Sequence, residues 1–379
     1  MRRSDPFKFL LSFLASLFLF SHISTAHAQL KELRDPSYIK NWGIYNTNNT
    51  RSDIQAFDAW KIQEGSHDVV VAVIDTGIDP HHKGLIKNLW RDPKEQQGKF
   101  GKNFVNPETN PLDEHGHGTH VAGIIGAEFD QYSGTSGVAH HVSLMPIKYY
   151  SDSNSGAVNL AHTIEAIHYA IDHGAKIINY SGGGPEFSEK EYLAIKRAES
   201  KGILFIAAAG NENQNIDRSQ NFYFPASYSN PAAFKRLPHQ PLSNIIVVAA
   251  TNKKNELIPA SNWGKNSVDV AAPGEDILST LPHGKSGTLT GTSQATAFVT
   301  GIAALILSEN SQLTPQEVRQ ILIDSSDTIP RLSEKVKSRG RVNVYRAVLS
   351  AHQLKRPMPI KKSNPNGDLA RLPIYKTEL

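Results

Sequence analysis

The chain has 379 residues, of which 39% are hydrophobic, enough to fill the core of one large α/β domain or two modest ones. It contains no cysteine, so disulfide bonds and lipidated cysteines are excluded. The net charge of +4 comes from the two ends, because residues 1–28 carry +2, residues 351–379 carry +4 and residues 29–350 carry about −2. A nucleic-acid-binding protein usually has a basic folded part, so this distribution argues against nucleic acid as a partner.

The first 28 residues have the pattern of a secretory signal peptide. A basic start, an apolar run and small residues at a cleavage site follow in order, at Arg2, Arg3 and Lys8, then Phe9 to Phe20, then Ala26 and Ala28. The apolar run is shorter than the roughly 20 residues that a transmembrane helix needs. We therefore expect export, with a secreted or periplasmic mature chain that begins near Gln29 and has no membrane span.

From Asp68 onward, short β-branched runs alternate with helical patterns, which is typical of parallel strands joined by helices. The expected strands are 69–74, 143–147, 176–180, 204–208, 244–249 and 268–270. The expected helices are 118–126, 158–173, 188–200 and the apolar segment 293–307. The sequence therefore predicts an α/β fold: a three-layer helix-sheet-helix sandwich with a mostly parallel sheet, in one domain over residues 29–350.

The C-terminal part contains one more helix signal and a tail. Thr314 has the form of a helix cap, Pro315 suits the first helical position, and Glu317 closes a capping box. The stretch 351–379 is polar, basic and interrupted by prolines, so we expect a solvated tail without a core of its own.

Three segments place a reactive side chain beside glycines. Asp75 ends a buried strand in Asp75-Thr76-Gly77, His117 opens a helix in Gly116-His117-Gly118, and Ser293 opens the apolar helix after Gly291. Taken singly, Asp75 would be interpreted as a strand-end carboxylate and Ser293 as a helix cap. Together they supply what peptide hydrolysis requires: a nucleophile, a base that accepts its proton, and a carboxylate that orients the base. His120, one helical turn beyond His117, is expected to be a hydrogen-bonded core residue.

These segments, in the chain order Asp, His, Ser, resemble the subtilisin-like serine peptidases, the subtilases. The resemblance covers about residues 35–348, including the segments 207–213 and 340–345. It implies that Asp75, His117 and Ser293 are catalytic. It also implies that the side-chain amide of Asn211 and the backbone N–H of Ser293 form an oxyanion hole.

The resemblance further implies where substrate and ions bind. Extended polypeptide substrates would pair with the segment Ser181, Gly182 and Gly183, facing a second wall of Ala208, Ala209 and Gly210. No cofactor is implied for the chemistry. Whether the chain binds a structural calcium ion is left open by the sequence. Asp130 is the candidate ligand, although the segment 128–137 does not match the usual ligand pattern.

The chain also departs from the family pattern. Gly182 stands where a larger apolar residue is common, and Gln294 stands where many members have methionine. Between residue 28 and Asp35 there is almost no room for an inhibitory propeptide. Two alternatives follow: the chain folds unaided, or a separately encoded propeptide or inhibitor is its partner.

Two other functions stay open on the sequence alone. In the first, the domain has lost catalytic activity and serves as a silent peptide-binding module. In the second, the same triad hydrolyses esters or amides other than peptide bonds. The presence of Asp75, His117, Asn211 and Ser293 together favours the endopeptidase.

Gln294 generates a first prediction. Oxidation of a methionine beside the nucleophile creates a polar sulfoxide, whereas glutamine has no sulfur to oxidise. The Gln294→Met variant is therefore expected to lose activity in hydrogen peroxide faster than the wild type, measured as inactivation rate constants. Equal rate constants would contradict the prediction.

Overall fold

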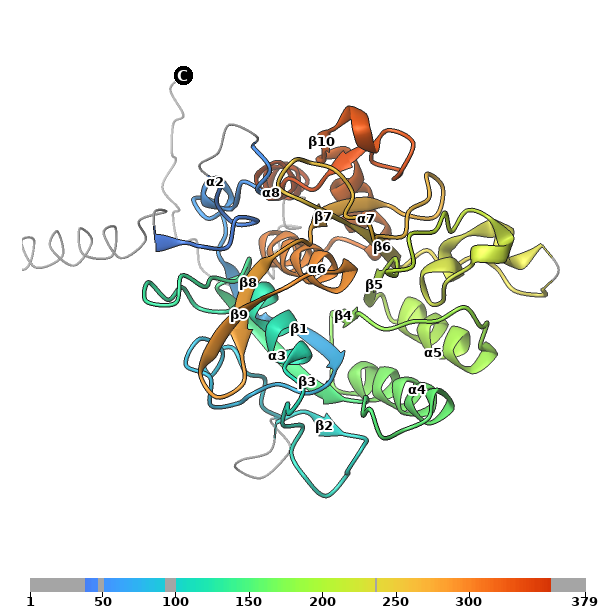
Figure 1. The fold of residues 1–379 in the computed structure, drawn as a ribbon, viewed down its shortest axis with the longest axis horizontal. Helices are drawn as coiled ribbons and strands as arrows, with labels where there is room; N and C mark the ends of the chain where they lie inside the picture. Colours follow the sequence, from blue (N-terminus) through green and yellow to red (C-terminus); the bar gives the residue numbers. More distant parts are fainter. Residues whose placement is uncertain (1–37, 47–50, 93–99, 236, 356–379) are drawn as a thin grey trace, which may run out of the picture.

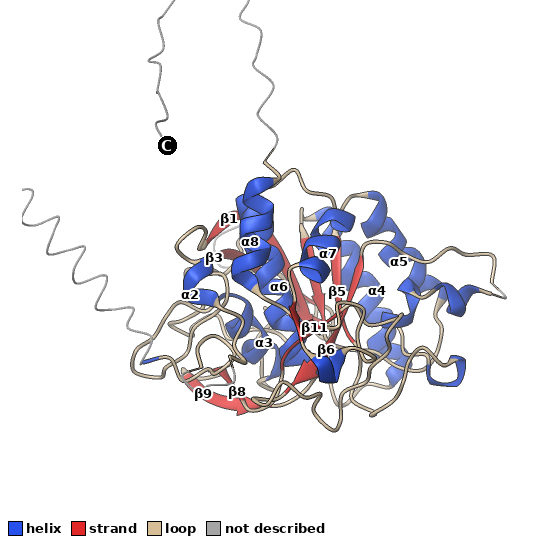
Figure 2. Cartoon of the chain, turned by 90° about the horizontal axis from the view of Figure 1, so that it is seen from above, coloured by secondary structure: helices blue, strands red, loops and turns tan. Residues whose placement is uncertain are grey.

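The computed structural model describes residues 38–46, 51–92, 100–235 and 237–355. These residues form a nine-stranded sheet with helices on both faces, which confirms the predicted three-layer α/β sandwich (Figures 1 and 2). The expected signal segment and nearly all of the expected tail lie outside the described residues. No helix in the described ranges is long and apolar enough to cross a membrane.

The sheet is parallel except at one edge. Its strand order is β10-β11-β7-β6-β5-β4-β1-β3-β2, and only β10 and β11 pair antiparallel. The strands are β1 (Gly65–Asp75), β2 (Lys102–Asn103), β3 (His141–Lys148), β4 (Ile177–Tyr180), β5 (Leu204–Ala208), β6 (Ile245–Thr251), β7 (Val270–Pro273), β10 (Asp327–Thr328) and β11 (Gly340–Arg341).

Alternate residues of each strand face two different helical layers. In β1, Val71 and Val73 pack into the cluster that holds α3, α6, α7 and α8, whereas Ala72 and Ile74 pack into the cluster that holds α4 and α5. The helices are α2 (Ala56–Ala59), α3 (His117–Gly126), α4 (Gly156–Asp172), α5 (Glu189–Ser200), α6 (Thr292–Glu309), α7 (Pro315–Asp324) and α8 (Val344–Gln353). Short 3₁₀ turns are η2 (Ser219–Asn221), η3 (Ala226–Ser229), η4 (Pro231–Phe234) and η5 (Pro330–Leu332).

The capping box that the sequence predicts is present at the start of α7. The Thr314 side chain accepts from the Glu317 backbone N–H, and the Glu317 carboxylate accepts from the Thr314 N–H. The sequence analysis missed α2, α8, the two-residue strands and a hairpin, β8 (Ile277–Leu281) with β9 (Lys285–Leu289). The hairpin escaped because β9, Lys-Ser-Gly-Thr-Leu, is mostly exposed and lacks a strand-like apolar pattern.

The strand order creates a switch point at β1. From β1 the chain moves to β3 on one side and then returns to β4 and β5 on the other. In open parallel sheets such a reversal leaves a crevice at the carboxyl ends of the strands, where ligands bind. Asp75 ends β1 and Ser181 follows β4, so both lie at this edge.

Candidate active site

Asp75 and His117 meet at the carboxyl end of β1. Asp75 Oδ1 lies 2.7 Å from His117 Nδ1. Asp75 is 3% exposed, whereas the side chain of His117 is 26% exposed, so the imidazole connects the interior with solvent. Because an ionised carboxylate only accepts, Nδ1 carries the proton and the opposite nitrogen, Nε2, keeps a lone pair. This arrangement suits a general base.

Glycine allows α3 to approach β1 this closely. A Cβ atom on Gly118 would lie 2.1 Å from the carbonyl oxygen of Gly77 and 3.1 Å from the Cβ of Asp75. Gly77 has a φ of +108°, in the region that favours glycine. The absence of a side chain at Gly118 therefore permits the contact between Asp75 and His117, while Gly77 permits the turn that follows β1 and its packing against Pro111.

The sequence analysis missed Asp113, which is 5% exposed. Its Oδ1 accepts hydrogen bonds from Thr76 Oγ1 and from the backbone N–H groups of His115 and Gly116. Its Oδ2 accepts from the N–H and the hydroxyl of Thr119, at 2.8 and 2.6 Å. One carboxylate thus fixes the first turn of α3 to the end of β1. The only local signal was an acidic residue just before a helix, which does not reveal burial.

The carboxylates around His117 raise the pKa of its imidazole. Burial lowers the pKa of His117, but the charge of Asp75, the hydrogen bond with Asp75 and the charge of Asp113 together raise that pKa above its ordinary value. Two carboxylates therefore make the imidazole a stronger base than a free histidine.

Ser293 is the second residue of α6 and is 7% exposed. The helix α6 packs against both β1 and α3, and its first residue, Thr292, bonds to Asn211 just beyond the end of β5. The start of α6 therefore lies at the same edge of the sheet as Asp75. Among the described residues no hydrogen bond joins the Ser293 hydroxyl to His117; such bonds often tighten only when substrate binds.

Asn211 is fixed by the start of α6. Its Oδ1 accepts from the Thr292 N–H at 2.9 Å and from the Thr292 hydroxyl at 3.1 Å. Because a backbone N–H can only donate, the amide oxygen faces the helix and the Nδ2 group is turned away from it. Asn211 is exposed, so Nδ2 is available as a donor beside the Ser293 N–H, which has no acceptor within the helix.

The two expected substrate segments lie side by side. The first segment, Ser181 to Gly183, follows β4. The second begins with Ala208 at the end of β5 and continues with Ala209 and Gly210. The two strands are paired in parallel, with Tyr180 opposite Ala207. The structure thus brings both segments to the carboxyl edge of neighbouring strands.

Tyrosine side chains pack closely against the glycines of these segments. A Cβ on Gly182 would lie 2.4 Å from the hydroxyl of Tyr149 and 2.7 Å from that of Tyr180, so the larger residue common in the family would not fit. Tyr223, which the sequence analysis missed, lies between the two segments. A Cβ on Gly183 would be 2.4 Å from its ring, and a Cβ on Gly210 would be 3.1 Å from it.

His120 is a core residue, as expected. It is 0% exposed, and its Nε2 lies 2.9 Å from the carbonyl oxygen of Ile277 and 3.1 Å from that of Gly287. Burial lowers the pKa of His120 to about 4, so it is neutral near pH 7. It ties the hairpin of β8 and β9 to α3.

The candidate calcium ligand Asp130 already has protein partners. Its Oδ1 accepts from the Tyr132 N–H and its Oδ2 from the Ser133 hydroxyl. Within the described part of the chain, no group of three or more His, Cys, Asp and Glu side chains is placed to hold a metal ion. These contacts favour a hydrogen-bonded turn at Asp130.

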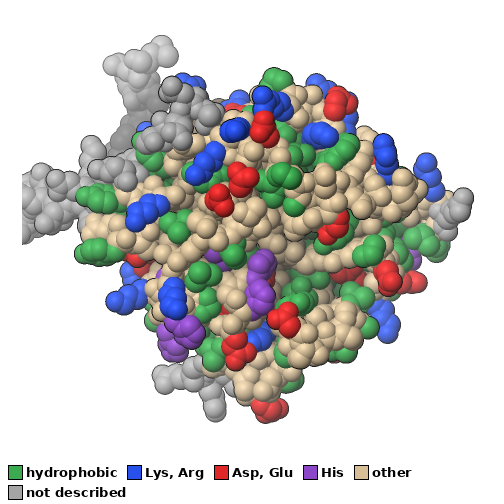
Figure 3. Space-filling view, viewed as in Figure 1, with side chains coloured by type: hydrophobic (Ala, Val, Ile, Leu, Met, Phe, Trp, Pro, Cys, Tyr) green, Lys and Arg blue, Asp and Glu red, His purple; other side chains and the backbone are tan. Residues whose placement is uncertain are grey.

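A pocket of about 230 Å³ opens at His117 and is also lined by Asp75, Tyr149, Ser181 and Gly182. Figure 3 shows histidine side chains exposed near the middle of the viewed face, with acidic and hydrophobic side chains close by. Basic and acidic side chains are interspersed over that face.

Comparison with known proteins defines the family. The model of the Subtilase family matches residues 66–350. The chain is 35% identical to the major intracellular serine protease of Bacillus subtilis over 284 residues, which cover 73% of this chain and 81% of that protein. It therefore belongs to the subtilases, the subtilisin-like serine peptidases.

Two further similarities agree with that assignment. The chain is 34% identical to the thermophilic serine proteinase of Bacillus sp. strain AK1 over 304 residues, 80% of this chain, but spans only 66% of that protein's length. A solved structure of proteases from Pseudoalteromonas arctica PAMC 21717 matches with a TM-score of 0.65 and 25% identity, covering 82% of this chain and 98% of the other.

The carboxylates around His117 predict the acid limb of the pH profile. Only neutral imidazole accepts a proton, so kcat/KM for an uncharged peptide should fall as the pH drops through the raised pKa of His117. The midpoint is expected above about 6.5, the value of a free histidine. The Asp113→Asn variant removes one charge that raises this pKa, so its midpoint should lie at lower pH.

Glu114→Gln is the matched control, because the Glu114 side chain is 88% exposed and pairs with Lys148. Its midpoint should equal that of the wild type. A midpoint in Asp113→Asn that also equals the wild type would refute the role of Asp113, provided that circular dichroism shows the variant to be folded.

Proposed function

We propose that the chain is an exported serine endopeptidase that cleaves polypeptides through an acyl-enzyme intermediate. The observation that carries the proposal is the 2.7 Å contact between Asp75 and His117 at the sheet edge where α6 presents Ser293. The membership of the Subtilase family agrees with it.

The proposed reaction has two halves. The Ser293 hydroxyl gives its proton to His117 Nε2 and its oxygen bonds to the carbonyl carbon of the scissile peptide, while Asp75 stabilises the resulting imidazolium. The Ser293 N–H and Asn211 Nδ2 donate to the oxyanion. His117 then protonates the leaving amine as the C–N bond breaks, and a water molecule activated by His117 hydrolyses the Ser293 ester.

The chain's own contacts favour this function over the two alternatives. A silent binding module would not need a buried carboxylate beside a partly exposed imidazole, an arrangement that tunes a base. Two glycine-containing segments on paired strands offer backbone groups to an extended chain, which suits polypeptides better than small esters.

A serine-directed phosphonate probe tests the chemistry. The probe should label the wild type, and casein should be digested, because the Ser293 hydroxyl is activated by His117. Ser293→Ala should lose the label and reduce digestion by several orders of magnitude, measured by mass spectrometry and peptide release. Absence of labelling in the wild type would favour the binding module; labelling without casein digestion would favour the ester or amide hydrolase.

Export needs a separate test, since the signal segment lies outside the described residues. In a bacterial host the Ser293→Ala chain, which cannot cleave itself, should leave the cytoplasm with an N-terminus near Gln29. Leu11→Arg together with Leu14→Arg should keep the chain in the cytoplasm, because charges interrupt the apolar run. Fractionation and N-terminal sequencing provide the measurement, and an uncut Ser293→Ala chain in the cytoplasm would contradict export.

A further inference from the structure

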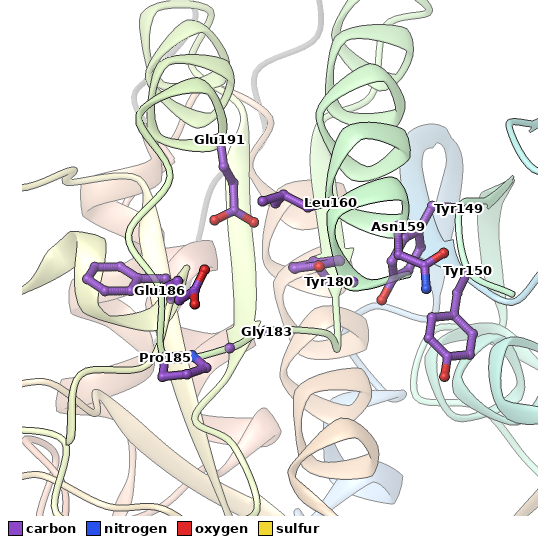
Figure 4. A pocket seen from close by; sticks show the side chains of 12 residues that line it. Tyr149, Tyr150, Asn159, Leu160, Tyr180, Gly183, Pro185, Glu186 and Glu191 are labelled. Carbon is purple, nitrogen blue, oxygen red and sulfur yellow. The ribbon is translucent and has the colours of Figure 1, made fainter. Parts of the chain in front are cut away.

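A cavity of about 290 Å³ lies beside the candidate active site, between the starts of α4 and α5 (Figure 4). It adjoins the pocket at His117, because Tyr149 and Tyr150 line both. The segment after β4 also runs along both: Ser181 and Gly182 line the pocket, and Gly183 and Gly184 line the cavity. A peptide paired with this segment would therefore pass from one to the other.

A buried carboxylate lies in the wall of this cavity. Glu191 of α5 is 4% exposed, and Figure 4 shows its carboxylate directed from the helix toward the cavity. Its Oε2 bonds to the hydroxyl of Tyr228 at 2.9 Å, while no described residue forms a hydrogen bond with Oε1. A second carboxylate, Glu186, lies at the exposed side of the same cavity.

Within the described residues, no cation pairs with either of these two carboxylates. The residues that line the cavity include no Lys, Arg or His, and neither Glu186 nor Glu191 forms an ion pair within the described chain. An ionised carboxylate without a cation is costly to bury. Burial accordingly raises the pKa of Glu191 to about 7, although the hydrogen bond from Tyr228 lowers it.

The hydrogen bonds around Tyr228 leave Glu191 short of a donor. The Tyr228 oxygen accepts from the Ser188 N–H, and its single proton has two acceptors, the Ser188 carbonyl oxygen at 2.8 Å and Glu191 Oε2 at 2.9 Å. The other titratable groups near Glu191 are the phenols of Tyr180 from β4 and of Tyr223, and the apolar Leu160 of α4 lines the same cavity. A ligand that brings N–H donors and positive charge would meet both needs.

We propose that this cavity binds an arginine or lysine side chain of the polypeptide being cleaved, and that Glu191 selects it. The inference rests on the proposed peptidase function and names a class of substrate for it. The rings of Tyr149 and Tyr180 add faces on which a guanidinium or ammonium group is stabilised.

The course of the segment 181–184 limits where in the substrate the selected basic residue can lie. An extended chain advances about 3.3 Å per residue, and the cavity begins two residues beyond Ser181. The selected side chain is therefore expected two to five residues from the cleaved bond.

The test compares peptides that carry arginine or citrulline, its uncharged analogue of equal shape, at each of these positions. At one position, kcat/KM at pH 8.5 should favour arginine by roughly tenfold or more, the size of a hydrogen-bonded interaction with a charge. In Glu191→Gln this ratio should fall close to one while the citrulline peptide is still cleaved. Glu189→Gln removes an exposed carboxylate of the same helix and should keep the preference.

The pH dependence provides a second readout on the unmodified protein. The ratio should rise as the pH increases through about 7, because Glu191 becomes ionised over that range. Titration of His117 affects both peptides equally and cancels in the ratio. This measurement decides the inference even if Glu191→Gln does not fold.

The outcomes separate the two proposals. Equal kcat/KM for both peptides at every position and pH would overturn the role of the cavity and leave the peptidase function intact. If neither peptide is cleaved and the phosphonate probe does not react, the peptidase function fails. Fluorescence anisotropy of the same peptides then decides the cavity: tighter binding of arginine that is lost in Glu191→Gln supports it, and equal binding overturns it.

Discussion

The close approach of α3 to the carboxyl end of β1 is the constraint on which the site depends. It places the imidazole of His117 against a carboxylate that water hardly reaches, where an electrostatic interaction is much stronger than at the surface. The missing side chain of Gly118 permits the approach, and Asp113 secures it by accepting the N–H groups that the start of α3 would otherwise leave unpaired.

The sheet topology brings the remaining groups to this contact. The order of strands reverses at β1, so residues that follow β1, β4 and β5 converge on one edge although they are far apart in sequence. The buried helix α6 passes behind this edge and is tied to β4 by the bond from Thr300 to Asn179, at 2.8 Å. Its first residue also orients the amide of Asn211. One helix thus supports the nucleophile and the amide donor together.

Aromatic side chains shape the surroundings of the site. Tyr149 and Tyr180 fill the space beside Gly182, and Tyr223 fills the gap between the two substrate segments. Tyr149 and Tyr180 also line the cavity that contains Glu191. The glycine at position 182 therefore leaves room for the hydroxyl groups of Tyr149 and Tyr180.

The sequence by itself determined most of the buried strands and helices, because hydrophobic periodicity is local, but not the exposed hairpin, the two-residue strands or α8. It also singled out Asp75, His117 and Ser293, because glycines mark each segment. Only the tertiary structure decided the roles of Asp113, Tyr223 and Glu191. A buried aspartate and an exposed one look alike in sequence, since burial and pairing depend on residues from distant segments. Asp113 accepts a hydrogen bond from Thr76, and no basic residue lines the cavity that Glu191 shares with residues of other segments. Short sequence motifs therefore identify the catalytic residues, whereas the pKa of the base and the shape of the substrate site depend on tertiary packing.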